Sequence, residues 1–221
     1  MVSTGRWTNL IKHVVPSPSL GIVLLAALAP LFWVKSGYVA KAEDFILPMN
    51  LSQWSEFFST WQTRVGFGSS PDDRLPALFF LFWPALFRAL GASIEVAQRL
   101  QFVFWCLGVG LSMYVLMRHL TSSRIAWSAA SLIYMFNFYQ EPIWQGINIA
   151  NLSALVAMPL ALAITIRFAA GARLLPSVTL LAFTSVIGSG VGANPPMALI
   201  AMIPVPLYMI AYFTHRLFIG Q

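Results

Sequence analysis

The sequence predicts an all-α, polytopic membrane protein with about six transmembrane helices and two interfacial juxtamembrane helices in its first outer loop. Of its 221 residues, 58% are hydrophobic and 9% are charged, and the mean hydropathy is +0.75. A soluble domain is about one quarter charged, so this much apolar surface needs lipid around it. The apolar segments do not alternate with polar residues, which argues against a membrane β-barrel. Helices also satisfy every backbone polar group inside hydrocarbon.

The first apolar run, residues 20–34, follows Arg6 and Lys12 and is interpreted as a retained anchor rather than a cleaved signal peptide. We expect one transmembrane domain over 1–221. It consists of a first span at 18–36, an outer loop at 37–97 and the remaining spans at 98–221. The later apolar runs are 76–90, 100–117, 125–138, 149–170, 174–188 and 197–213.

The distribution of Lys and Arg predicts the orientation. The connections at 118–124 and 167–173 and the tail at 215–216 are basic, whereas the linkers 137–148 and 188–196 contain no Lys or Arg. Basic connections favour the cytoplasm. We therefore expect a protein of the cytoplasmic membrane with a cytoplasmic N-terminus and an extracytoplasmic outer loop.

The run 76–90 is short, rich in aromatic residues and interrupted by Pro84. We expect it not to cross the membrane but to lie at the outer interface as a juxtamembrane helix. In the alternative, it crosses together with 100–117, and Arg118 and Arg124 then lie outside, against the charge rule. The run 100–117 reaches spanning length when it is extended back to Ile94.

The segment 50–64, NLSQWSEFFSTWQTR, repeats aromatic residues at helical spacing between polar ones. This pattern predicts an amphipathic helix that lies flat at the headgroup level, where tryptophan is favoured. It is the second juxtamembrane helix of the outer loop. A turn with Asp72 and Asp73 joins it to the run 76–90, and turn chemistry or the start of a helix accounts for these two acids.

The net charge of +6 is not a nucleic-acid signal, because the basic residues stand singly at the ends of segments. Cys106 is the only cysteine and lies inside an apolar run, which is typical of a small core residue. His13, His119 and His215 are far apart and lack metal-ligand spacing.

An acidic pair, Glu43 and Asp44, follows the first apolar run in the stretch KAEDFILPMN, and a long outer loop comes next. Residues 74–120 then contain a Pro/aromatic helix, a Gly turn, the motif AQRL and a span that ends in basic residues. This order resembles the N-terminal part of the GT-C glycosyltransferases, in particular the branch that includes the arabinofuranosyltransferases. The resemblance covers roughly 20–124, and the rest of the chain agrees only in hydropathy. Family members usually have more spans.

The resemblance implies transfer of a sugar from a polyprenyl-phosphate donor on the extracytoplasmic side. The essential acid of the family corresponds to Asp44, with Glu43 as its neighbour. A carboxylate at the membrane edge is able to accept the proton of an acceptor hydroxyl. The simpler interpretation of the pair is a solvated loop beside Lys41 that caps a helix.

Further candidates are named for substrate binding. The donor phosphate needs positive charge, and Lys41, Arg64, Arg74 and Arg99 are predicted on the outer side, although snorkelling alone explains such residues. The linker 137–148 is rich in aromatic and amide groups that suit a sugar ring.

Glu141 in that linker is a second candidate carboxylate. We expect it to orient the acceptor or, with Asp44, to bind a divalent cation such as Mg²⁺ or Mn²⁺. The simpler explanation is an exposed acid in an interfacial belt of aromatic residues. Asn194, in the glycine-rich linker, is a further substrate contact.

Two other functions remain open. The short chain and its eight tryptophans also suit a non-catalytic subunit or scaffold that contacts lipids and partner membrane subunits. A transporter would carry charged residues within its spans, and these spans contain almost none.

Overall fold

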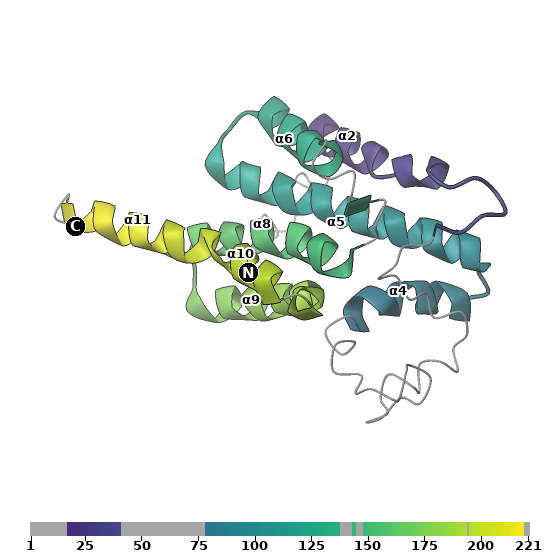
Figure 1. Ribbon diagram of the computed structural model, residues 1–221. Coiled ribbons are helices and arrows are strands. Elements are labelled where there is room, and N and C mark those ends of the chain that lie inside the picture. The colour runs from purple at the N-terminus through teal and green to yellow at the C-terminus, as the bar shows by residue number, and fades with distance from the viewer. Residues whose placement is uncertain (1–16, 41–77, 138–142, 145–147, 194, 219–221) are drawn as a thin grey trace, which may run out of the picture.

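The computed structural model describes residues 17–40, 78–137, 143–144, 148–193 and 195–218. Within these ranges the chain is helical and forms no strand, which confirms the predicted helical class (Figure 1). The elements in chain order are α2 (Pro18–Ala26), the 3₁₀ helix η1 (Ala29–Phe32), α4 (Leu78–Ala89), α5 (Ile94–Leu120), α6 (Arg124–Phe136), α8 (Ile149–Ala169), α9 (Leu174–Ile187), the 3₁₀ helix η6 (Gly188–Ala193), α10 (Pro195–Met202) and α11 (Pro204–Phe218).

Four helical segments of the described chain are long and apolar enough to cross a membrane, and they indicate an integral membrane protein. They are Ile94–Leu120, Ala150–Ala169, Leu174–Gly192 and Ala198–Phe218. All four agree with predicted spans. The two other predicted spans correspond to α2 with η1 and to α6, and these helices are shorter than the ~20 residues that a crossing needs.

The first apolar run is a broken helix rather than the continuous span that its hydropathy predicts. Proline has no N–H group, so Pro30 cannot donate to the carbonyl group of Ala26, where α2 ends. The chain continues as η1 with Pro30 near its start. Ser17 caps α2 by accepting a hydrogen bond from the Leu20 N–H at 3.4 Å.

The predicted juxtamembrane run 76–90 contains α4, which packs antiparallel against the first half of α5. Its 12 residues span about 18 Å, which is less than the ~30 Å of a bilayer core. A glycine turn reverses the chain: the Gly91 N–H donates to the Arg88 carbonyl oxygen and the Ala92 N–H to that of Phe87, both at 3.0 Å. Gly91 has φ +90°, which glycine adopts without strain.

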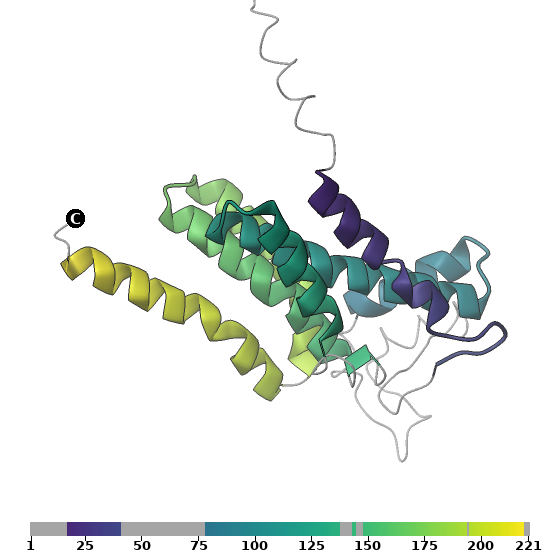
Figure 2. The same cartoon turned by 90° about the horizontal axis from the view of Figure 1, so that it is seen from above.

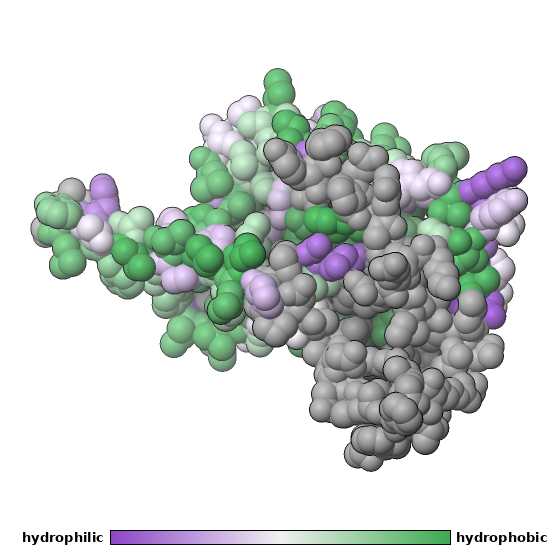
Figure 3. All heavy atoms as spheres, viewed as in Figure 1, coloured by the Kyte–Doolittle hydropathy of each residue, from purple (hydrophilic) through white to green (hydrophobic). Residues whose placement is uncertain are grey.

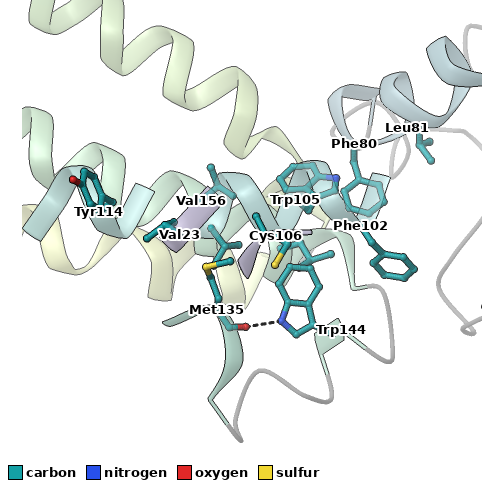
Figure 4. Packing of buried hydrophobic residues seen from close by; sticks show 13 residues of the cluster. Val23, Phe80, Leu81, Phe102, Trp105, Cys106, Tyr114, Met135, Trp144 and Val156 are labelled. Atoms are coloured by element: carbon teal, nitrogen blue, oxygen red, sulfur yellow. Dashed lines mark hydrogen bonds between the residues drawn. The ribbon is translucent and has the colours of Figure 1, made fainter. Parts of the chain in front are cut away.

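Helix α5 is the centre of the bundle, because α2, α4, α6 and α8 all contact it. Its 27 residues measure about 40 Å. Close approach is possible at Gly110, where a Cβ atom would lie 2.5 Å from the Met135 Sδ atom and 3.0 Å from a Val23 methyl group. These residues belong to the core shown in Figure 4, which also contains Trp105 and Cys106.

Two prolines release backbone carbonyl groups inside the bundle, and side chains of neighbouring helices bind both. Pro84 leaves the Phe80 carbonyl without its helical donor, and Gln101 Nε2 donates to it at 3.2 Å. Pro159 does the same to Leu155 in α8, whose carbonyl oxygen accepts from Tyr134 at 3.1 Å and Ser112 at 3.3 Å. Side chains that re-satisfy such groups make proline tolerable in membrane helices.

The basic connections lie together at one end of the bundle, at the left in Figure 1; we call it the basic end and define it by Arg118, Arg124, Arg167, Arg173 and Arg216. Helix α8 packs along the second half of α5, where Ser112 donates to the Leu155 carbonyl oxygen, and both helices end at this side of the bundle (Figure 1). The Tyr212 hydroxyl donates to the Ala169 carbonyl oxygen at 2.7 Å and brings α11 to the same end.

The start of α2 belongs to the basic end as well. The hydroxyl groups of Ser17 and Ser19 lie 2.9 and 3.0 Å from that of Tyr114, near the end of α5. The start of α2 and the basic connections therefore lie at the same end of the bundle, as the charge pattern predicts. Which side of a membrane this is stays a prediction.

Helices α9, α10 and α11 form the exposed flank of the bundle. Figures 1 and 2 show α11 at the edge of the molecule, and Figure 3 shows that the surface over these helices is mainly hydrophobic. No residue of α11 is buried. A lipid-facing flank of this kind is expected of a membrane bundle, because the hydrocarbon is as apolar as the side chains.

Candidate functional site

A cavity of about 630 Å³ lies beside the first half of α5 and the end of α6, at the end of the bundle opposite to the basic end. Its wall combines aromatic side chains with one amide, and the lining residues are Trp33, Val34, Ala40, Phe102, Phe136, Asn137 and Trp144. We call it the aromatic cavity. Pockets for small molecules fall in the range of about 300–1,000 Å³ and are mostly apolar with few polar groups. The aromatic cavity has this size and composition.

Trp33 is the centre of the aromatic wall. Its ring makes edge-to-face contacts with Phe102 at 5.9 Å, Phe136 at 6.5 Å and Trp144 at 5.4 Å between centroids. Trp144 is fixed by its indole N–H, which donates to the Met135 carbonyl oxygen at 2.9 Å (Figure 4). The rings therefore come from the residue after η1, from α5, from α6 and from the chain after α6, and they hold these segments around the cavity.

Asn137 is the polar residue of the wall. Its Nδ2 group donates to the Ile133 carbonyl oxygen at 3.0 Å. Its Oδ1 atom is buried and has no hydrogen-bond partner among the described residues. A buried acceptor without a partner is costly.

The first turns of α5 hold the backbone of residues 34–40 by side-chain hydrogen bonds; we call Glu95, Gln98 and Arg99 the α5 clamp. Glu95 Oε2 accepts from the Gly37 N–H at 2.8 Å. Gln98 accepts from the Ala40 N–H at 2.8 Å and donates to the Ala40 carbonyl oxygen at 2.7 Å. Gln98 is 1% exposed, and both its amide oxygen and its amide nitrogen bind this backbone. The clamp fixes the wall of the cavity at Ala40.

Arg99 is the one predicted site residue that falls within the described ranges. Its Nη2 group donates to the Val34 carbonyl oxygen at 2.7 Å and forms an ion pair with Glu95 Oε1 at 2.6 Å. Its buried Nε atom has no partner in the described part of the chain. Arg99 thus has a structural role beside the cavity, and its predicted contact with a donor phosphate stays a prediction.

The other predicted site residues lie outside the described residues, and the structure brings none of them together. They are Lys41, Glu43, Asp44, Arg64, Arg74, Glu141 and Asn194. The amphipathic segment 50–64 lies outside them as well. Among the residues that are described, no three His, Cys, Asp or Glu side chains gather to hold a metal ion. The predicted cation ligands, Asp44 and Glu141, are not tested by this result.

Sequence reasoning did not single out the residues that form the cavity wall. Trp33, Phe102 and Phe136 stand inside or at the edge of apolar runs, where aromatic residues are ordinarily assigned to lipid or core. A signal did exist for Gln98 of the clamp, because it and Gln101 lie three residues apart in a mainly apolar helix. Buried amides of this kind need partners.

Comparison with protein-family models, with curated proteins and with solved structures finds no match to the chain.

Proposed function

We propose that the chain is a membrane glycosyltransferase, or the N-terminal part of one. In this proposal it transfers a sugar from a polyprenyl-phosphate donor to a glycan, lipid or protein of the cell envelope. The observation that carries the proposal is the aromatic cavity at the end opposite to the basic connections. Aromatic faces stack on sugar rings, and Asn137 places an amide residue in the same wall.

The predicted acids are tethered to this cavity by short lengths of chain. Asp44 is four residues beyond Ala40, so even an extended chain keeps it within about 14 Å of the cavity wall. Glu141 is three residues before Trp144, within about 11 Å of the wall. This proximity supports the assignment of both carboxylates to the cavity.

In the proposed reaction, Asp44 acts as a general base at the edge of the membrane. An acceptor hydroxyl oxygen attacks the anomeric carbon of the sugar, while the bond from that carbon to the phosphate oxygen breaks. The electron pair leaves with the polyprenyl phosphate, and the hydroxyl proton passes to the Asp44 carboxylate. Lys41 and Arg74 stabilise the departing phosphate by their positive charge.

The base assignment is tested with Asp44→Asn. Loss of a general base slows a reaction by about 10²–10⁴-fold, so sugar transfer from a polyprenyl-phosphate sugar should fall by this factor. The matched control is Asp73→Asn, which removes an acid of the same outer loop that turn chemistry explains. Both variants should elute and unfold like the parent protein. An Asp44→Asn variant that keeps its turnover removes Asp44 from the mechanism.

The cavity is tested independently of turnover. A photoreactive polyprenyl-phosphate analogue should label peptides around Trp33 and Phe136, and excess polyprenyl phosphate should suppress the label. Ala40→Trp fills the cavity and should abolish labelling, whereas Ala211→Trp on the exposed face of α11 should not. Equal labelling of both variants would contradict the assignment of the cavity to the donor.

The exposed flank favours a second candidate function, that of a non-catalytic subunit. No residue of α11 is buried, and Leu207, Ile210 and Phe213 are each more than half exposed. A helix of a partner membrane protein could cover this surface in place of lipid. Under this proposal a partner membrane protein co-purifies with the chain, and the donor analogue does not label the cavity.

A further inference from the structure

A second pocket, of about 310 Å³, lies at the basic end between the end of α8 and the start of α9. Its lining residues are Ile164, Arg167, Gly171, Ala172, Arg173, Pro176, Ser177 and Leu180. We call it the basic pocket. It lies at the opposite end of the bundle from the aromatic cavity, and sugar transfer as proposed above makes no use of it.

The two arginines of the basic pocket stand on either side of a backbone turn that fixes the connection between α8 and α9. The Gly171 N–H donates to the Phe168 carbonyl oxygen at 2.9 Å, and the Ala172 N–H donates to that of Arg167 at 3.0 Å. Gly171 has φ +94°, the conformation that ends a helix in this way. Helix α9 begins one residue after Arg173, so both arginines flank a short, fixed connection.

The positive charge of this pocket has no counterion in the described chain. The only described carboxylate is Glu95, which pairs with Arg99 at the other end of the bundle. Neither guanidinium group, of Arg167 or of Arg173, makes an ion pair or a side-chain hydrogen bond within the described residues. Neither the basic connections nor the tail contains an acid, because the acidic residues of the chain are Glu43, Asp44, Glu56, Asp72, Asp73, Glu95 and Glu141.

Other cations strengthen the field around the pocket. Arg118 lies in the last turn of α5, at the same end of the bundle as the pocket. Its guanidinium group lies over the Trp127 ring at 5.6 Å. A group of fixed positive charges with no internal acid attracts an external anion.

The apolar part of the pocket decides which anion fits. Ile164, Pro176 and Leu180 lie beside the arginines. The adjoining surface of α9 is apolar and open, with Leu175 77% and Val178 51% exposed. A molecule with a phosphate group and an acyl chain matches both parts, whereas free phosphate would use only the arginines. Basic pockets between membrane helices bind the headgroups of anionic lipids.

We propose that the basic pocket between α8 and α9 binds the phosphate headgroup of an anionic phospholipid through Arg167 and Arg173, with the lipid chain along α9. The Arg guanidinium group suits this task, because its planar donors bind two phosphate oxygens at once.

The test is lipid binding to the full chain, measured by native mass spectrometry with phosphatidylglycerol and with phosphatidylcholine. The double variant Arg167→Gln/Arg173→Gln should bind phosphatidylglycerol about thirtyfold more weakly than the parent, since each basic residue near an anionic headgroup contributes about a factor of five. Binding of phosphatidylcholine should not change. The matched control is Arg118→Gln/Arg216→Gln, which removes the same charge from the same end. It should weaken binding much less, because these two residues add to the field around the pocket but do not line it.

A second variant keeps both arginines. Ala172→Asp places a carboxylate in the pocket as an internal counterion and should also abolish the preference for phosphatidylglycerol. Equal weakening in the pocket and control double variants would overturn the proposal, because the binding would then be diffuse. Displacement of the lipid by millimolar inorganic phosphate would identify a site for free phosphate instead, and would equally overturn it.

Discussion

Helices α5 and α11 are both apolar and long enough to cross a membrane, yet they occupy opposite positions in the bundle. In the most apolar stretch of α5 half of the residues are buried, and in that of the α11 segment none is. The buried residues of α5 include the polar Gln98, Gln101 and Ser112, whereas α11 exposes Ile210 and Phe213. Hydropathy therefore does not distinguish a central helix from a lipid-facing one. Polar residues and glycine inside an apolar run do so better.

The largest difference between the two helices is expected when one aromatic side chain is removed from each. Trp105 in α5 is 1% exposed and stacks on Phe80 at 5.0 Å. Trp105→Ala should cost about 3–5 kcal/mol of unfolding free energy, because it leaves a cavity in the core. Phe213→Ala in α11, at a residue 55% exposed, should cost less than about 0.5 kcal/mol. Thermal unfolding in detergent measures both, and equal losses would place α11 in the core.

The next effect concerns the polar residues that mark α5 as central. Gln101→Ala removes the side-chain donor to the Phe80 carbonyl, which the N–H-less Pro84 does not replace, and should cost about 1–3 kcal/mol. In a Pro84→Ala background the helix supplies its own donor, and the same substitution should cost much less. A double-mutant cycle measures this coupling. Additive losses would mean that Gln101 contributes only by packing.

The smallest effect is expected at the hydrogen bond that ties α11 to the bundle. Tyr212→Phe removes the donor to the Ala169 carbonyl oxygen and should cost about 0.6 kcal/mol, the average for such bonds in membranes. Hydrogen exchange should accelerate in α11 alone. Tyr134→Phe, which removes one of two donors to the Leu155 carbonyl in the core, should leave exchange in α11 unchanged. Faster exchange throughout the chain after Tyr212→Phe would show that α11 supports the whole bundle.

The sequence predicted the helical class, the extension of the central span back to Ile94 and the gathering of the basic connections at one end. These features depend on composition and charge, which are local. The break of the first run is not predicted by hydropathy, because hydropathy averages over the whole run and does not register the single N–H group that Pro30 lacks.

The candidate site was less predictable than the fold. The sequence predicts that Arg99 contacts a donor phosphate, whereas in the structure its guanidinium group donates to the Val34 carbonyl oxygen, 65 residues away in sequence. Backbone acceptors carry no sequence signature, so such a partner is invisible before the fold is known. The aromatic cavity has the same origin: Trp33 and Trp144 meet only because η1 and the chain after α6 converge on α5.

The carbonyl groups released by Pro84 and Pro159 have a mechanical consequence. Gln101 and Ser112, both on α5, donate hydrogen bonds to these carbonyl groups of α4 and α8. The bonds fix the position of each neighbouring helix along the axis of α5. If α4 or α8 moved along its axis by one helical turn, about 5.4 Å, its carbonyl group would lose the hydrogen bond from α5 inside the hydrocarbon. We therefore expect the aromatic cavity to widen by tilting or rotation of whole helices about these hydrogen bonds rather than by sliding of one helix along another.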